Sequence, residues 1–75
     1  MPYFERADSS ALSYARYDRR HRRLYLTFRD SGEMYVYLDV PPSDYEALLA
    51  ADSKGRFVNE RIKLRYRFLH LRHAS

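Results

Sequence analysis

The most regular hydrophobic pattern in the chain is the strict alternation of residues 24–28, LYLTF. Alternate side chains of an extended strand point to opposite faces, so the two leucines and the phenylalanine of this segment share one face. Segments 11–17 (ALSYARY) and 33–40 (EMYVYLDV) predict a strand on either side of it. Residues 18–23 are polar and residues 29–32 end in a glycine, so both segments predict turns. The three strands should therefore form an antiparallel meander.

Two prolines end the predicted sheet and begin a helical region. Proline cannot donate a hydrogen bond to a neighbouring strand, and Pro42 suits the first turn of a helix. Ser43 and Glu46 offer another start, because they have the spacing of a capping box. The sequence does not decide between these two starts, which differ by about two residues. The buried stripe of this helix should consist of Tyr45, Leu48 and Leu49.

A second helix is predicted from about Lys54 to Tyr66, after a break at residues 51–55. Either Asp52 or Ser53 would cap its first turn. Its apolar residues Val58, Ile62 and Tyr66 recur at helical spacing, with Phe57 alongside. The opposite face is mostly basic and carries Arg56, Glu60, Lys63 and Arg67.

These elements predict an α+β fold, with a three-stranded antiparallel β-meander followed by two α-helices packed on one face. One hydrophobic core is expected, because a chain of 75 residues has no room for a second. The predicted core comprises Leu12, Leu24, Leu26, Phe28, Val40, Tyr45, Leu48, Leu49, Phe57, Val58 and Ile62.

Tyr35 and Tyr37 are two residues apart in the third strand, so their rings point to the same face. A three-residue hairpin loop at 30–32 would place both rings on the face opposite the leucines, as an exposed platform on which nucleic-acid bases stack. A two-residue loop at 31–32 or at 30–31 shifts the register by one and turns both rings into the core. Two of the three registers therefore make these tyrosines core residues, and we favour that interpretation over the platform.

Charge is distributed unevenly along the chain. The net charge of +4 is the sum of three segments: residues 1–30 carry +3, residues 31–52 carry −5 and residues 53–75 carry +6. Such asymmetry indicates an anionic partner, although ordinary solvated surface charge explains it equally well. The absence of cysteine fits a reducing cytoplasm, and no apolar run reaches the length of a membrane span, so we expect a cytoplasmic protein that does not bind membranes.

Two groups of basic residues are the candidate phosphate contacts. The first lies in the predicted turn between strands one and two and consists of Arg19, Arg20, Arg22 and Arg23. The second lies on the second helix and consists of Lys54, Arg56, Lys63 and Arg67. Residues 53–56 (SKGR) also begin a helix, where free backbone N–H groups favour phosphate, or they simply connect the two helices. The separation of the two groups in space depends on which end of the sheet the second helix approaches.

No catalytic constellation is visible in the sequence. Ser9, Ser10 and Ser53 have no positioned histidine base, and the carboxylates of residues 31–52 form no acid–base couple. His70 and His73 are three residues apart, but they lack a third ligand for a metal. We therefore expect no enzymatic activity, no metal and no cofactor.

Several segments closely resemble the KTSC domain, a small bacterial domain found at the C-terminal end of some lysyl-tRNA synthetases and as a free-standing protein. They are residues 9–18 (SSALSYARYD), the LYLTF strand, Tyr35-Val36-Tyr37 and residues 40–62 (VPPSDYEALLAADSKGRFVNERI). The resemblance implies one domain at 9–68, between an N-terminal extension at 1–8 and a C-terminal tail at 69–75. It establishes no activity, but attachment to a tRNA synthetase suggests RNA binding.

Two positions depart from the KTSC pattern. Val36 stands where family members commonly have a charged residue, and that family pattern favours tyrosines pointing inward. Residues 19–23 (RRHRR) are more basic than the usual family turn, so a role for this loop does not carry over from the family.

Two functions from different classes remain. In the first, the protein is a monomeric RNA-binding module that contacts the phosphate backbone with little sequence specificity. In the second, it is a protein-interaction module whose acidic first helix, with Asp44 and Glu46, docks a basic surface, or two copies pair basic on acidic.

Overall fold

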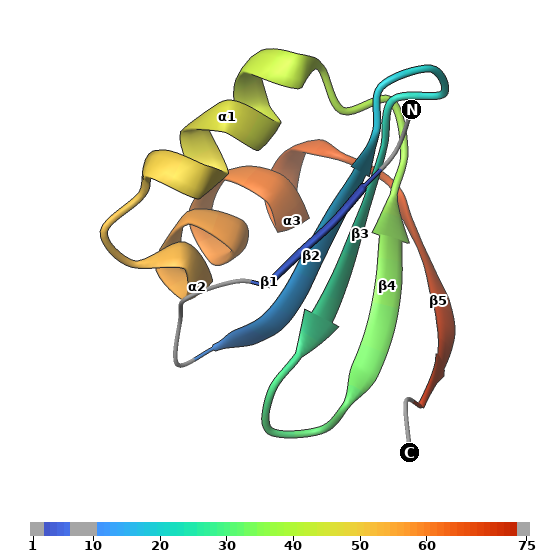
Figure 1. Cartoon of the computed structure of the whole chain (residues 1–75), viewed down its shortest axis with the longest axis vertical. Helices are drawn as coiled ribbons and strands as arrows, with labels where there is room; N and C mark the ends of the chain where they lie inside the picture. The colour runs from blue at the N-terminus through green and yellow to red at the C-terminus, as the bar shows by residue number, and fades with distance from the viewer. Residues whose placement is uncertain (1–2, 7–10, 74–75) are drawn as a thin grey trace.

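The fold is a five-stranded antiparallel sheet with all its helices on one side (Figure 1). The computed structural model describes residues 3–6 and 11–73. The strands are β1 (Tyr3–Arg6), β2 (Leu12–Asp18), β3 (Arg23–Phe28), β4 (Glu33–Tyr37) and β5 (Phe68–His73). Between β4 and β5 the chain forms α1 (Pro42–Ala50) and a second helical segment made of α2 (Lys54–Phe57), the π-helical turn η1 (Val58–Ile62) and α3 (Lys63–Arg65).

The α+β class and the one-sided helices are confirmed, but the predicted number of three strands was too low. The sheet order is β1-β2-β3-β4-β5, so both additional strands are edge strands. β1 pairs with β2, and β5 returns after the helices to pair with β4. Edge strands are stabilised by the strand they pair with, and neither segment has the strong alternation of LYLTF. Most of β1 and β5 therefore falls in the segments that the sequence assigned to the extension and the tail.

The register between β3 and β4 decides where the two tyrosines point. Leu24 lies opposite Tyr37 and Leu26 opposite Tyr35, as expected for the alternative with the turn at residues 30–31. The connection runs from Phe28 to Glu33, and Gly32 (φ 71°) donates its N–H to the Phe28 carbonyl at 2.8 Å. Glycine adopts this left-handed conformation without the steric cost that a side chain brings.

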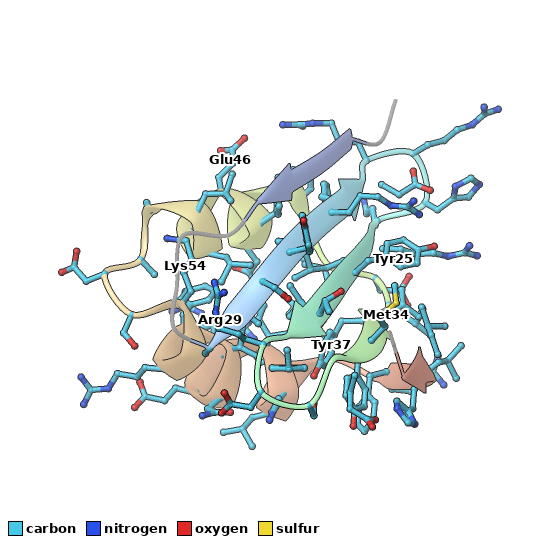
Figure 2. The ribbon with its side chains drawn as sticks, turned by 60° about the horizontal axis from the view of Figure 1, so that its bottom comes forward. Tyr25, Arg29, Met34, Tyr37, Glu46 and Lys54 are labelled. Atoms are coloured by element: carbon cyan, nitrogen blue, oxygen red, sulfur yellow. The ribbon has the colours of Figure 1, made fainter. Side chains whose placement is uncertain are left out.

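Tyr37 therefore belongs to the core, where it is 2% exposed, and Tyr35 is half-buried against it. Figure 2 shows Tyr37 on the side of the sheet that faces the helices, and Tyr25 and Met34 on the other side. The core interpretation is confirmed, and the exposed-platform register is wrong.

The predicted core residues all lie in the hydrophobic cluster or pack against it. Tyr17, which was not among the predicted core residues, is also buried and only 1% exposed. Its ring stacks on Tyr45 of α1 with 4.8 Å between the centroids, and its hydroxyl donates to the Val40 carbonyl at 2.5 Å. Burying an aromatic ring whose hydroxyl has a partner stabilises the contact between β2, α1 and the segment that joins β4 to α1.

The helix termini resolve the alternatives that the sequence left open. α1 begins at Pro42 after Pro41 as its N-cap, with no side-chain capping bond, so the capping-box start is wrong. The second helical segment starts where predicted, and the Ser53 hydroxyl caps it by accepting the Arg56 N–H at 3.4 Å. No helix within the described residues is long and apolar enough to cross a membrane.

Gly55 lies where α2 approaches the segment before β2. A Cβ atom added there would lie only 2.6 Å from the Cβ atom of Ala11. Gly55→Ala should therefore destabilise the protein by about 1–3 kcal/mol in urea unfolding, since overpacking forces the two segments apart. The double variant Gly55→Ala/Ala11→Gly removes the opposing methyl group and should recover part of the loss. Equal stability of Gly55→Ala and wild type would show that α2 shifts without cost.

Tyr17, Tyr37 and Tyr66 should ionise at unusually high pH. Burial raises the pKa of Tyr17, raises that of Tyr37 to about 12, and together with the Asp44 hydrogen bond raises that of Tyr66. The unfolded chain loses these protons near its ordinary tyrosine pKa of about 10, whereas the folded chain retains them. The contribution of these tyrosines to the free energy of unfolding is therefore fully present below a pH of about 10. It is lost as the pH rises toward 12. Tyrosinate absorbance during a pH titration should show a late-ionising group that merges with the others once urea unfolds the protein.

Candidate nucleic-acid interface

The basic loop between β2 and β3, residues 19–22, is shaped by Asp18 at the end of β2. One Asp18 carboxylate oxygen accepts the backbone N–H of Arg20 at 3.1 Å and of His21 at 3.3 Å. The other lies 2.9 Å from Nδ1 of His21, and this hydrogen bond lowers the pKa of the Asp18 carboxyl. An aspartate that accepts backbone N–H groups two and three residues ahead fixes a turn. The loop therefore has a defined shape from which its arginines project.

All four predicted arginines of this region, Arg19, Arg20, Arg22 and Arg23, are exposed. Arg19 pairs with Glu46 of α1 at 3.3 Å, but both side chains are more than half exposed. Exposed pairs of this kind contribute only about 0–1 kcal/mol, so Arg19 can exchange Glu46 for another anion. Within the described part of the chain, Arg20, Arg22 and Arg23 form no ion pair.

Arg67, directly before β5, lies at the same end of the sheet as this loop although it is distant in sequence. The Leu38 N–H donates to the Arg67 carbonyl at 2.9 Å, and the Val40 N–H donates to the Arg22 carbonyl at 2.9 Å. Residues 38–40 therefore hold Arg67 and the loop at one end of the sheet. We call the exposed arginines at this end the basic end; they are Arg19, Arg20, Arg22, Arg23 and Arg67.

The other predicted basic residues are not part of this group. Lys54 lies beside the end of α1 (Figure 2) and donates to the Leu49 and Ala51 carbonyls, both at 3.2 Å. These bonds satisfy carbonyls that the last turn of α1 leaves without intrahelical partners. Arg56 forms an exposed pair with Glu60 at 3.2 Å along the second helical segment. Of the second predicted group of basic residues, only Arg67 thus lies at the same end of the sheet as the arginines of the β2–β3 loop.

Lys63 and the residues around it form a separate aromatic region. Its Nζ lies 5.2 Å from the centroid of the Phe28 ring. Tyr35 lies next to Phe28 and also contacts Phe68 and His70 of β5. The strand β5 was not predicted, and all of it except Phe68 falls in the segment that was expected to be a C-terminal tail. The alternation of Leu69 and Leu71 with polar residues was the available signal for this strand.

The acidic surface that would dock a protein partner is smaller than the sequence indicated. Asp44 is 8% exposed, and its carboxylate accepts a hydrogen bond from the Tyr66 hydroxyl. Glu46 is exposed but already paired with Arg19. Both carboxylates thus have partners within the chain, and Asp44 is buried, so little acidic surface remains on α1.

The chain is similar to a known domain family and to a crystal structure from that family. The model of the KTSC domain matches residues 8–66. A KTSC domain protein from Yersinia pestis has a similar crystal structure, with a TM-score of 0.87 and 30% sequence identity, over 96% of this chain and 100% of that one.

Two relatives have different lengths. A protein from Tsukamurella paurometabola is 45% identical over 64 residues, which are 85% of this chain and 94% of the relative. A lysine–tRNA ligase from Nostoc punctiforme is 38% identical over 64 residues, again 85% of this chain but only 11% of the ligase. The similarity to the ligase therefore covers a small part of that enzyme.

Proposed function

The chain belongs to the KTSC domain family, and we propose that it is a non-catalytic module that binds single-stranded RNA through the phosphate backbone. Nothing in the sequence or in the described residues indicates catalytic activity, and one relative is a tRNA ligase. The proposal is supported above all by the basic end, where two segments distant in sequence place exposed arginines at the same end of the sheet. Phosphate contacts supply most of the sequence-independent affinity of a protein for nucleic acid.

The geometry suits backbone contacts better than base reading. The guanidinium groups lie on a loop and a strand end, and arginine binds phosphate oxygens through paired N–H donors. If each of the arginines of the basic end contacts one phosphate, log affinity against log salt concentration should have a slope of roughly −3.5. Binding should therefore be weak at physiological salt and nearly independent of sequence.

The direct test replaces Arg19, Arg20, Arg22 and Arg23 together by serine. Binding of a fluorescently labelled single-stranded RNA of mixed sequence is followed by anisotropy over a range of low salt concentrations. We expect at least a tenfold loss of affinity, and the contribution of the basic end to the salt slope should fall to roughly −0.7, because Arg67 alone of its arginines remains. The variant should stay folded, since the replaced side chains are exposed.

A matched pair of double variants separates the basic end from net charge alone. Arg19→Ser/Arg20→Ser and Arg56→Ser/Arg61→Ser remove the same charge, and each includes one arginine of an exposed ion pair. The first should weaken RNA binding several-fold more than the second. Equal effects would mean that RNA is attracted by overall charge and not by the basic end. Undetectable binding at low salt would refute the RNA proposal.

A protein partner is the second candidate, and the sheet face away from the helices supports it. Leu69 and Leu71 of β5 are 55% and 42% exposed there, beside a depression of about 310 Å³ that also includes Leu38. Exposed apolar residues that gather on one surface are typical of protein-interaction sites. This hypothesis takes first place if the RNA titration shows no binding.

A further inference from the structure

A pocket of about 440 Å³ opens between the β4–β5 edge of the sheet and the end of the second helical segment. It is lined by Phe28, Ser31, Tyr35, Tyr37, Lys63 and Phe68. Its volume falls within the range of about 300–1,000 Å³ that is usual for small-molecule sites. Four of the six lining residues are aromatic, and among the six only Lys63 is charged.

The aromatic rings of this pocket hold one another in place. Tyr35 contacts Phe28 and Phe68 edge-on, with centroids 5.6 and 5.5 Å apart, and stacks on His70 at 4.7 Å. Nε2 of His70 in turn contacts a carboxylate oxygen of Glu33 of β4, which holds the imidazole ring in place. Packing on several sides gives the Tyr35 ring a fixed orientation, so the pocket wall is already formed without a ligand.

Phe68 offers an accessible aromatic surface at the mouth of this wall. It is 51% exposed although its neighbours Tyr35 and Tyr37 are half-buried and buried. The Tyr37 centroid lies 5.7 Å from that of Phe68, which anchors one edge of the Phe68 ring. An anchored and half-exposed ring is suited to stacking with a flat ligand.

Lys63 adds a positive charge to the rim. Its side chain is exposed and makes no ion pair within the described residues, while its Nζ lies over the Phe28 ring. The pocket thus combines aromatic walls with one cation. That combination fits a flat aromatic ring that carries an anionic group nearby.

We propose that this pocket binds one unstacked nucleobase against Phe68, with the adjoining phosphate on Lys63. The ligand is then a nucleotide of single-stranded RNA or a free mononucleotide. The inference builds on the proposed RNA-binding function, because Arg67 of the basic end directly precedes Phe68 in the chain.

Titration followed by NMR tests the pocket and separates the two sources of ligand. The probes are pentaadenylate RNA, adenosine monophosphate and ribose 5-phosphate. Pentaadenylate should shift the aromatic resonances of Phe28, Tyr35 and Phe68 through the ring current of the bound base. Adenosine monophosphate should produce the same shifts at higher concentration if free nucleotides are also ligands, whereas ribose 5-phosphate should leave these resonances in place.

Two matched pairs of variants give the affinity test. Phe68→Ala should weaken pentaadenylate binding about tenfold. Leu69→Ala should leave binding unchanged, because Leu69 is similarly exposed but lies on the other face of the sheet. Phe68→Tyr should retain binding because it keeps a stacking ring. Lys63→Gln should weaken binding and reduce the salt slope, whereas Arg65→Gln on the same helical turn should do so less.

The possible outcomes distinguish the pocket from the basic end. One outcome is that the quadruple arginine variant loses RNA affinity while Phe68→Ala binds RNA as tightly as wild type and pentaadenylate shifts no aromatic resonance of the wild-type pocket. In that case the pocket proposal is wrong and the RNA function stands. If the aromatic shifts persist in the quadruple variant at unchanged affinity, the pocket is supported and the basic end is wrong. If pentaadenylate and adenosine monophosphate shift no pocket resonance even at low salt, the pocket proposal fails.

Discussion

Replacing Tyr37 by alanine is expected to destabilise the protein by about 3–5 kcal/mol, as for other truncations of large aromatic core residues. The ring is 2% exposed on the helix-facing side of the sheet, opposite Leu24 and against Phe68. Small domains have a total stability of only about 5–15 kcal/mol, so the variant should be largely unfolded in moderate urea. The urea midpoint measured by circular dichroism decides the result.

Two further variants show whether the Tyr37 ring or its hydroxyl is responsible. Tyr37→Phe should remain within about 1 kcal/mol of wild type, because the hydroxyl has no hydrogen-bond partner within the described residues. Tyr25→Ala removes a half-buried tyrosine from the other face of the sheet and should cost less than Tyr37→Ala. A nearly unchanged urea midpoint for Tyr37→Ala would contradict the register of β3 and β4.

The second large effect is expected at Asp44, in the first turn of α1. Asp44→Ala should destabilise the protein by about 2–3 kcal/mol. The change removes a charged acceptor from the Tyr66 hydroxyl, a bond worth about 1.5–3 kcal/mol. It also removes a negative charge near a helix N-terminus, worth about 0.3–1 kcal/mol at exposed positions. Chemical unfolding of the variant and wild type under the same conditions gives the difference.

Controls for Asp44 come from its partner and from a neighbouring acid. Asp44→Asn keeps an acceptor oxygen and should cost less than Asp44→Ala. Glu46→Ala, which changes an exposed acid two residues further along α1, should alter stability by less than about 0.5 kcal/mol. A double-mutant cycle with Tyr66→Phe should show a coupling of about 0.5–3 kcal/mol. Simple additivity of Asp44→Ala and Tyr66→Phe would mean that the two side chains do not interact.

Local sequence patterns were sufficient for the central elements of this fold. The alternation of LYLTF, the two prolines and the helical spacing of Tyr45 and Leu48 each depend on neighbouring residues. The structure places β3, α1 and the second helical segment close to where these patterns predicted them. The same patterns identified the core residues of these elements, because burial on one face imposes the periodicity of the element.

The candidate sites were predicted less completely. The sequence identified the arginines of the β2–β3 loop, but it grouped Arg67 with Lys54 and Arg56 because all three belonged to one predicted helix. The helix ends at Arg65 and the chain then turns into β5, which moves Arg67 to the basic end. Phe68 was missed because an exposed edge strand leaves only a weak pattern.

The sequence by itself determined the α+β class, the central strands, both helical regions and most of the core, since local periodicity and proline chemistry carry that information. Only the tertiary structure decided the register of Tyr35 and Tyr37, because a one-residue slip is compatible with the same local pattern. It alone also decided the pairing of β5 with β4, the burial of Asp44 beneath Tyr66 and the approach of Arg67 to the basic loop. Each of these depends on contacts between residues far apart in the chain, whose energies exist only once the helices have packed on the sheet.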